Sequence, residues 1–336
     1  DWSSDVCSSD LGAVFDVEDT HAGRTVAMKV LRCDRAAHGS ARARRFINEA
    51  RVTAALEHPN IVPVYDMGMS AHGTLFYTMK HIRGEALSDI LARLARGDDE
   101  TAEHYPLDHL AQILTKACNA LAYAHSRNIV HCDVKPENIM VGNYGEVLVV
   151  DWGLAAAVGS DAAADTTTQA DSDVAAETVD ADAEDAAAPS SAPAGGTPAY
   201  MAPEQATGRS TDAGVDARTD VYGLGGVLYA ILTLDVPFRG RDQGHTMEQK
   251  RAGQLVPPAA YGRGGAHARE LPHCPGGEVP KALSAVAERA LAPAPADRYQ
   301  SVRELQHDLA AFRAGYAVRA ENAGSLRLLW LLWRRR

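Results

Sequence analysis

Two short stretches of the chain carry a dense set of polar side chains. "HCDVKPEN" and "VVDWG" place Asp133, Lys135, Asn138 and Asp151 within nineteen residues. Carboxylate and amide oxygens are the ligands that a hard cation such as Mg²⁺ prefers. The alternative for an isolated Asp or Asn in such a loop is a turn residue that only bonds the neighbouring backbone. The surrounding sequence must decide between a cation site and an ordinary turn.

Two further charged residues lie upstream, each in a segment with its own periodicity. Lys29 ends "VAMK" within residues 12–30, where apolar and polar residues alternate as in two strands joined by "THAGR". Glu49 lies within residues 41–56, where the apolar positions predict a helix that ends near His58–Pro59. A solvated surface charge is the default interpretation of an isolated Lys or Glu. The strand and the helix around these residues favour a defined role instead.

The remaining periodicities divide the chain into a small β-rich part and a larger helical part. Residues 60–68 and 73–82 are predicted to form two more strands. After Gly84, helical periodicity appears in residues 87–97, 107–126, 220–234, 280–291 and 301–315. This order predicts an α+β fold in which a small, mostly antiparallel sheet with one helix precedes a mostly helical region.

Charge and composition exclude several classes of protein. The formal net charge is −11, but nine acidic residues lie in residues 161–185 and three more in residues 1–10. The body of the chain is therefore near neutral, and its charge gives no support for a nucleic-acid partner. The five cysteines match no metal-site spacing and are expected to be thiols in a reducing cytosol. No run of 18 apolar residues occurs, so we expect membrane attachment only through regions beyond Arg336.

The ordered set of motifs resembles the protein kinase family, specifically the bacterial serine/threonine kinases of eukaryotic (Hanks) type. The resemblance covers residues 11–315, and the order and spacing of the motifs agree throughout. It implies a fold of two lobes, a small β-rich lobe over residues 11–79 and a larger helical lobe over residues 83–315. It also implies a non-specific serine/threonine protein kinase that acts in signalling and transfers the γ-phosphoryl group of ATP to protein hydroxyls. The implied cofactor is Mg²⁺, with Mn²⁺ as a substitute.

The resemblance assigns roles to the residues introduced above. Asp133 orients the substrate hydroxyl and accepts its proton, and Lys135 stabilises the transferring phosphoryl group. Asn138 and Asp151 hold the metal ion. Lys29 contacts the α- and β-phosphates, and Glu49 pairs with it. The other implied ATP contacts are Gly12, Val14, Ala27, Met79, Lys80 and Ile82, with Met79 in the gatekeeper position.

Further residues of the resemblance belong to the scaffold and the activation segment. Lys135 and Thr197, in "GTPAYMAPE", are typical of serine/threonine kinases and not of tyrosine kinases. Glu204 is expected to pair with Arg298. Asp220 is expected to bond the backbone of the catalytic loop, where His131 has a structural role.

Three departures from the family pattern stand out. Cys132 replaces the Arg that gathers a phosphorylated activation segment through charge-assisted bonds, which puts activation by that route in doubt. Trp152 replaces the usual Phe after Asp151. Residues 155–195 contain no Lys, Arg, Leu or aromatic residue, so they are expected to be a disordered acidic insertion.

Both ends of the chain differ from the body. "DWSSDVCSSD" lacks strand alternation and the first two glycines of the phosphate-binding hairpin, so residues 1–10 are interpreted as adapter-derived, non-native sequence. Residues 316–336 are interpreted as a juxtamembrane-like tail. Together these features suggest a cytoplasmic kinase domain whose parent is a single-pass inner-membrane protein.

Two other interpretations remain. A pseudokinase acting as a binding module is the first, although pseudokinases typically lack one of the four residues Lys29, Asp133, Asn138 and Asp151. A small-molecule kinase of the same fold is the second, although such enzymes lack the "GTPAYMAPE" segment.

The acidic insertion yields a testable prediction. Its hydroxyl cluster and its position between "DWG" and "APE" favour autophosphorylation there, but no Lys or Arg between Lys135 and Arg209 can pair with the added charge. Deleting residues 160–190 is therefore expected to leave phosphoryl transfer within a few-fold, which is about 1 kcal/mol or less in barrier. Turnover of the deleted and parent proteins measures this, and a hundred-fold loss would identify the insertion as an activation element.

Overall fold

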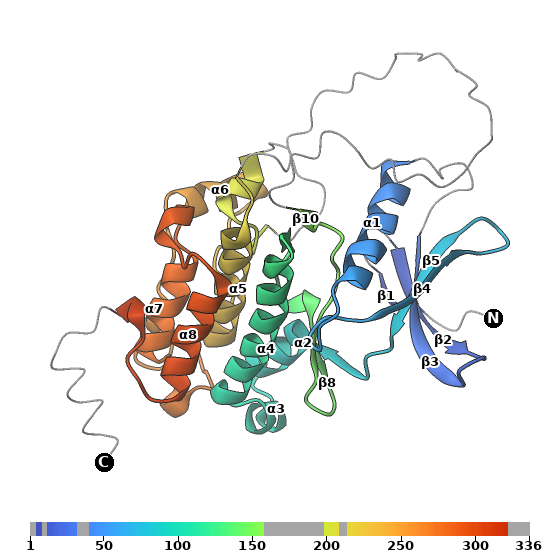
Figure 1. Cartoon of the computed structure of the whole chain (residues 1–336). Helices are drawn as coiled ribbons and strands as arrows, with labels where there is room; N and C mark the ends of the chain where they lie inside the picture. The colour runs from blue at the N-terminus through green and yellow to red at the C-terminus, as the bar shows by residue number, and fades with distance from the viewer. Residues whose placement is uncertain (1–4, 9–11, 32–39, 158–197, 208–213, 322–336) are drawn as a thin grey trace.

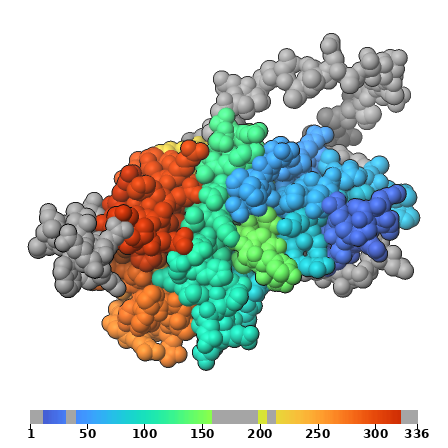
Figure 2. All heavy atoms as spheres, turned by 60° about the horizontal axis from the view of Figure 1, so that its bottom comes forward, coloured from blue at the N-terminus to red at the C-terminus, as the bar shows by residue number. Residues whose placement is uncertain are grey.

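The computed structural model describes residues 5–8, 12–31, 40–157, 198–207 and 214–321, and Figure 1 shows them as two lobes. A sheet covered by helix α1 (Ala41–Ala55) forms one lobe, and a group of long helices forms the other. The predicted α+β class is confirmed. In Figure 2 the light green residues around β8 (Ile139–Gly142) and β9 (Val147–Val149) lie where the two lobes meet.

The small lobe is a five-stranded antiparallel sheet. Its order is β1 (Asp5–Ser8), β2 (Gly12–Asp19), β3 (Arg24–Leu31), β5 (Leu75–Lys80) and β4 (Val64–Met69). Helix α1 begins after Ser40, whose side chain accepts a hydrogen bond from the Ala43 N–H. Phe46 of α1 packs on Tyr77 of β5 in the core of this lobe, so the helix is fixed directly against the sheet.

Strand β1 departs from the expectation that residues 1–10 form no strand. Cys7 pairs with Val14 and Ser8 with Ala13 in an antiparallel ladder, with an irregularity between Asp5 and Cys7. A β-ladder uses main-chain N–H and C=O groups, which every non-proline residue carries. A polar sequence can therefore extend the sheet even though it lacks apolar alternation.

The large lobe contains the predicted helices. They are α2 (Leu87–Ala95), α4 (Leu107–Ser126), α5 (Ala217–Thr233), α7 (Lys281–Ala290) and α8 (Val302–Arg313). Two more, α3 (Asp99–His104) and α6 (Gln243–Arg251), were not predicted. Both are polar and lack an apolar stripe, but each has an Asp N-cap whose side chain accepts a main-chain hydrogen bond.

Short strands join the lobes and carry the loops between them. β6 (Gly84–Ala86), β8 and β9 form a three-stranded sheet in that order. β7 (Ile129–Val130) pairs with β10 (Ala156–Ala157). The beginning of the segment predicted to be disordered is therefore part of this small sheet, whereas residues 158–195 lie outside the described residues.

The large lobe also extends past the predicted boundary at residue 315. Val318 is buried in the core, and the main-chain N–H groups of Arg319 and Ala320 donate to the buried carboxylate of Asp308. Residues 318–320 are thus attached to the lobe, because the N–H groups and the carboxylate satisfy one another. Within the described residues, no helix has the length and hydropathy needed to cross a bilayer.

A glycine sets how closely α5 approaches the loop after β7. A Cβ atom on Gly223 would lie 2.7 Å from the Cβ atom of Val134. That separation is far below a normal contact, so any side chain at residue 223 would push the loop away from the helix.

We expect Gly223→Ala to lower the free energy of unfolding by about 1–3 kcal/mol through overpacking. Gly264→Ala is the control, since a Cβ atom added there would lie 3.5 Å from Glu278 Oε1, an ordinary van der Waals contact. Denaturant unfolding of both variants tests the prediction, and equal stabilities would show that the loop yields without cost.

Candidate active site

A buried ion pair joins the sheet of the small lobe to its helix. Lys29 lies on β3 and Glu49 on α1, and Lys29 Nζ is 2.5 Å from Glu49 Oε1. Both side chains are almost fully buried. Burial acts to lower the pKa of Lys29, but the charges of Asp151 and Glu49 outweigh it and leave the pKa raised. Lys29 therefore remains an ammonium group that a phosphate could contact.

Tyr77 is a third member of this cluster that the sequence analysis missed. Its hydroxyl donates to Glu49 Oε1 at 2.7 Å, the same oxygen that pairs with Lys29. Glu49 Oε2 is buried without a hydrogen-bond partner among the described residues. The position of the Glu49 carboxylate therefore depends on two donors to a single oxygen. Only the pairing of β3 with β5, which places Lys29 opposite Tyr77, reveals this contact.

The loop after β7 is held by one carboxylate on α5. Asp220 Oδ2 accepts from the His131 N–H, and Oδ1 accepts from the Cys132 N–H, both at 2.9 Å. His125 Nε2 lies 2.7 Å from Oδ2. Burial would raise the pKa of Asp220, but the bond and charge of His125 and the contacts of His131 lower it. The carboxylate therefore remains ionised and fixes two consecutive amides.

These bonds support an unusual backbone at Cys132. Its φ is 66°, in the left-handed region that a residue with a Cβ atom rarely adopts. The ring of His131 also shapes the loop: its Nδ1 accepts from the Asp133 N–H at 3.2 Å, which leaves Nε2 to donate to the Val150 carbonyl at 3.1 Å. This network fixes the main chain at Asp133.

Asp133, Lys135 and Asn138 come together in one cluster. Lys135 Nζ is 2.8 Å from Asp133 Oδ2. Asn138 Nδ2 donates to the Asp133 main-chain oxygen at 2.8 Å and to Oδ2 at 3.1 Å. Burial acts to lower the pKa of Lys135, but the hydrogen bond and charge of Asp133 leave it raised. The cluster presents one oriented carboxylate beside one ammonium group.

Asp151 connects the two clusters. It follows β9 with a φ of 63°, and its Oδ1 lies 3.6 Å from Lys29 Nζ. The next residue, Trp152, is fully buried, with its ring centroid 4.6 Å from that of His131. The indole therefore anchors the turn that directs Asp151 towards the small lobe.

Asn138 and Asp151 have the donor chemistry of a hard-cation site. The Asn138 amide nitrogen donates to Asp133, so its amide oxygen could serve as a metal ligand, and Asp151 offers a carboxylate. The described residues contain no group of three His, Cys, Asp or Glu side chains that could hold a metal ion by themselves. Magnesium typically takes one or two protein oxygens and completes its shell with phosphates and water, so these two residues fit Mg²⁺.

The segment that joins the lobes carries the residues expected near adenine. Met79 and Ala27 face each other across β5 and β3. The Lys80 N–H donates to the Pro63 carbonyl at 3.1 Å, so this N–H is not available to a ligand. Gly12 packs on β3 so closely that a Cβ atom there would lie 2.4 Å from the Val30 carbonyl oxygen.

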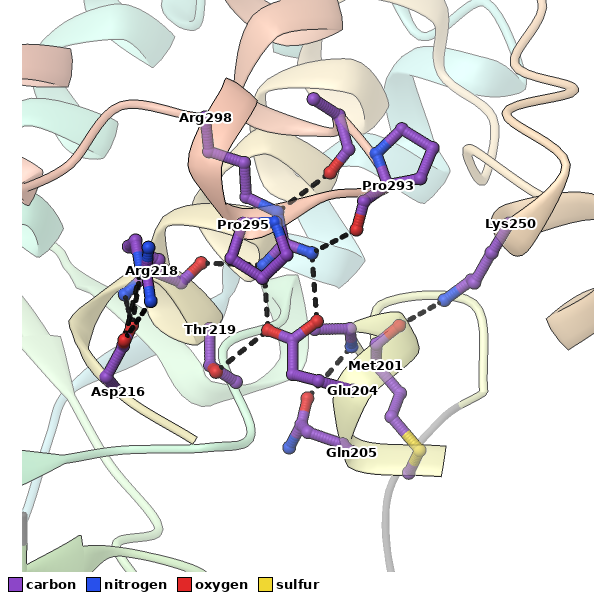
Figure 3. Close-up of polar contacts among 12 residues, drawn as sticks. Met201, Glu204, Gln205, Asp216, Arg218, Thr219, Lys250, Pro293, Pro295 and Arg298 are labelled. Carbon is purple, nitrogen blue, oxygen red and sulfur yellow. Dashed lines mark hydrogen bonds and ion pairs between the residues drawn. The ribbon is translucent and has the colours of Figure 1, made fainter. Parts of the chain in front are cut away.

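The scaffold residues of the large lobe meet in a second buried network, shown in Figure 3. Both terminal nitrogens of Arg298 donate to Glu204, at 2.7 and 2.9 Å, and Thr219 donates to the same carboxylate. Gln205 Nε2 donates to the Cys132 carbonyl at 2.7 Å, which ties this network to the catalytic loop. Thr197 lies outside the described residues.

The described geometry defines a class of protein. A small antiparallel sheet holds a buried Lys–Glu pair, and the adjoining helical lobe supplies an Asp–Lys–Asn loop and Asp151. This combination is that of an enzyme that transfers a phosphoryl group from a nucleotide.

Comparison with known sequences narrows the class. The sequence profile of the protein kinase domain matches residues 6–309, and the chain belongs to this family. Relatives named serine/threonine-protein kinase PknD occur in Protochlamydia amoebophila (33% identical over 318 residues), Chlamydia pneumoniae (36% over 310) and Chlamydia trachomatis serovar L2b (33% over 311). Each alignment covers 91% of this chain but only 29–30% of the relative. The family expected from the sequence is confirmed, and the profile begins within residues 1–10.

Removing one hydroxyl tests the part played by Tyr77. Tyr77→Phe leaves Glu49 Oε1 with Lys29 as its single donor, so we expect phosphoryl transfer from ATP to fall about 5-fold, roughly 1 kcal/mol. Tyr65→Phe is the control, because the side chain of Tyr65 is 42% exposed. Steady-state kcat/KM for ATP measures the effect, and identical values for both variants would contradict it.

Proposed function

We propose that this chain is a serine/threonine protein kinase domain that transfers the γ-phosphoryl group of ATP to Ser and Thr hydroxyls of protein substrates. The observation that carries the proposal is the approach of Asp151 to within 3.6 Å of Lys29 while Lys29 is paired with Glu49. This arrangement joins the phosphate-binding and metal-binding residues of both lobes, as phosphoryl transfer requires.

The residues divide the work of binding and proton transfer. Lys29 binds the α- and β-phosphates, and Glu49 with Tyr77 keeps the ammonium group in place. Asn138 and Asp151 hold Mg²⁺, with Mn²⁺ as a substitute; the bound cation supplies charge neutralisation on the phosphate oxygens. Gly12 and Val14 cover the nucleotide, while Ala27, Met79, Lys80 and Ile82 surround the adenine.

Asp133 and Lys135 act at the acceptor hydroxyl. Asn138 orients the Asp133 carboxylate, which accepts the hydroxyl proton as the oxygen attacks the γ-phosphorus and ADP leaves. Lys135, 2.8 Å from Asp133 Oδ2, neutralises the phosphoryl oxygens during transfer. The Asp133–Lys135 pair thus serves the protein substrate and the nucleotide together.

Two observations favour serine and threonine acceptors over other substrates. Lys135 occupies the loop position that is typical of serine/threonine kinases, and the PknD relatives carry that activity in their names.

Cys118, Cys132 and Cys274 are free thiols, which supports a cytoplasmic location for the domain. The relatives are about three times as long as this chain, so we propose this activity for the domain as one part of a longer signalling protein. We propose in addition that the parent is a single-pass inner-membrane protein.

Two conservative substitutions test the proposal. Asp133→Asn removes the proton acceptor and Asp151→Asn removes a metal carboxylate, so each is expected to lower phosphoryl transfer at least 100-fold, about 2.7 kcal/mol. Asp99→Asn, on the exposed start of α3, is the matched control. Transfer of labelled phosphate from ATP to casein measures the activity.

The outcomes separate the alternatives. Near-normal transfer by Asp151→Asn would remove the basis of the metal assignment. A parent protein that binds ATP but transfers no phosphate would favour the pseudokinase interpretation.

A further inference from the structure

Lys250 is a buried charged residue that the proposed mechanism does not use. It lies near the C-terminal end of α6 and is 0% exposed. Its Nζ donates to the main-chain oxygens of Pro198 at 2.6 Å and Met201 at 2.5 Å, the latter visible in Figure 3. The rings of Tyr222 and Phe238 have their centroids 5.3 and 5.5 Å from Nζ, within cation–π range.

The buried ammonium group of Lys250 is not needed for the stability of the large lobe alone. Burial lowers the pKa of Lys250 to about 7, and the charge of Glu204 acts in the opposite direction. An apolar side chain of similar length would fill the same volume without the cost of desolvating an ammonium group. An apolar side chain could not make the two hydrogen bonds that the Lys250 ammonium group donates to the segment Pro198–Met201.

That segment forms a wall of a cavity beside the catalytic loop. Tyr200, within the segment, lines a cavity of about 200 Å³ together with Pro136 and Glu137 of the loop. Leu234 and Val236, which follow α5, line it as well. Pro136 and Glu137 directly follow Lys135, so the cavity lies beside the residues proposed to act on the acceptor hydroxyl.

The next part of the chain is held by different contacts. Arg298 binds the carboxylate of Glu204, and the Gln205 side chain bridges the Ala202 N–H and the Cys132 carbonyl. These contacts fix residues 202–205 to the catalytic loop and to the core. Lys250 provides a separate attachment for residues 198–201, the part that reaches the cavity.

We infer that Lys250 is a positioning residue for the protein substrate. By holding the carbonyls of Pro198 and Met201, its ammonium group keeps Tyr200 in place as a wall for the polypeptide that carries the acceptor hydroxyl. The inference rests on the proposed kinase function. It predicts that loss of the charge weakens binding of the protein substrate and leaves the nucleotide site unchanged.

The test compares Lys250→Met with Arg251→Met, an exposed neighbour on the same helix. With casein as the substrate, Lys250→Met is expected to raise KM for casein about 10-fold, while KM for ATP and ATP hydrolysis without casein stay within about 2-fold. Lys250→Arg, which keeps the charge and both donors, is expected to recover most of the loss. If Lys250→Met does not bind nucleotide like the parent, Lys250→Gln replaces it in the same comparison.

Each result has a distinct meaning. An unchanged KM for casein in an otherwise active variant would overturn the role of Lys250. Equal losses in casein phosphorylation and casein-independent ATP hydrolysis would also overturn it, because they would indicate a general structural defect. A parent protein without phosphoryl transfer would overturn the proposed function, and this inference with it.

Discussion

The catalytic loop depends on one buried carboxylate. Asp220 accepts the N–H groups of His131 and Cys132 with its two oxygens and is almost completely inaccessible to solvent. A buried charge is tolerated only where hydrogen bonds replace water, and the bond from His125 completes that requirement. Without these bonds, the left-handed backbone of Cys132 would lose two of the hydrogen bonds that hold it, and the position of Asp133 would be less well fixed.

A second constraint is that the two lobes must present their charges to one place. Lys29 is fixed by Glu49 within the small lobe, whereas Asp151 is fixed by the burial of Trp152 within the large lobe. Their separation of 3.6 Å therefore reports how the lobes meet. Since Tyr77 also bonds Glu49, the aromatic core of the small lobe takes part in setting that separation. The packing of Tyr77 on Phe46 therefore also affects the position of the Lys29–Glu49 ion pair.

The sequence predicts those parts of the structure in which the pattern of residue types depends on whether a side chain is buried or exposed. Apolar periodicity located the main helices, and motif spacing located the charged residues that the fold brings together. Strand β1 was missed because its pairing uses the backbone, and α6 was missed because a polar helix carries no apolar stripe. Tyr77 and Lys250 were missed because their partners lie far away in sequence or are main-chain oxygens, which leave no pattern in the residue types.

Two buried cations near the activation segment, Arg298 and Lys250, have different partners in place of the water that each loses on burial. Arg298 has a carboxylate partner, Glu204, and binds it through two nitrogens. Among the described residues, the Lys250 ammonium group contacts two main-chain oxygens and two aromatic rings, with Glu204 as a nearby charge, and burial lowers its pKa from 10.5 to about 7. Between these values the unfolded chain binds a proton that the folded chain lacks, so this residue makes the fold more stable as pH rises. Over the same range its hold on Pro198 and Met201 weakens, because the ammonium group is lost. The cation that is paired with a carboxylate therefore anchors the scaffold, and the cation that is bonded to main-chain oxygens attaches the segment beside the cavity.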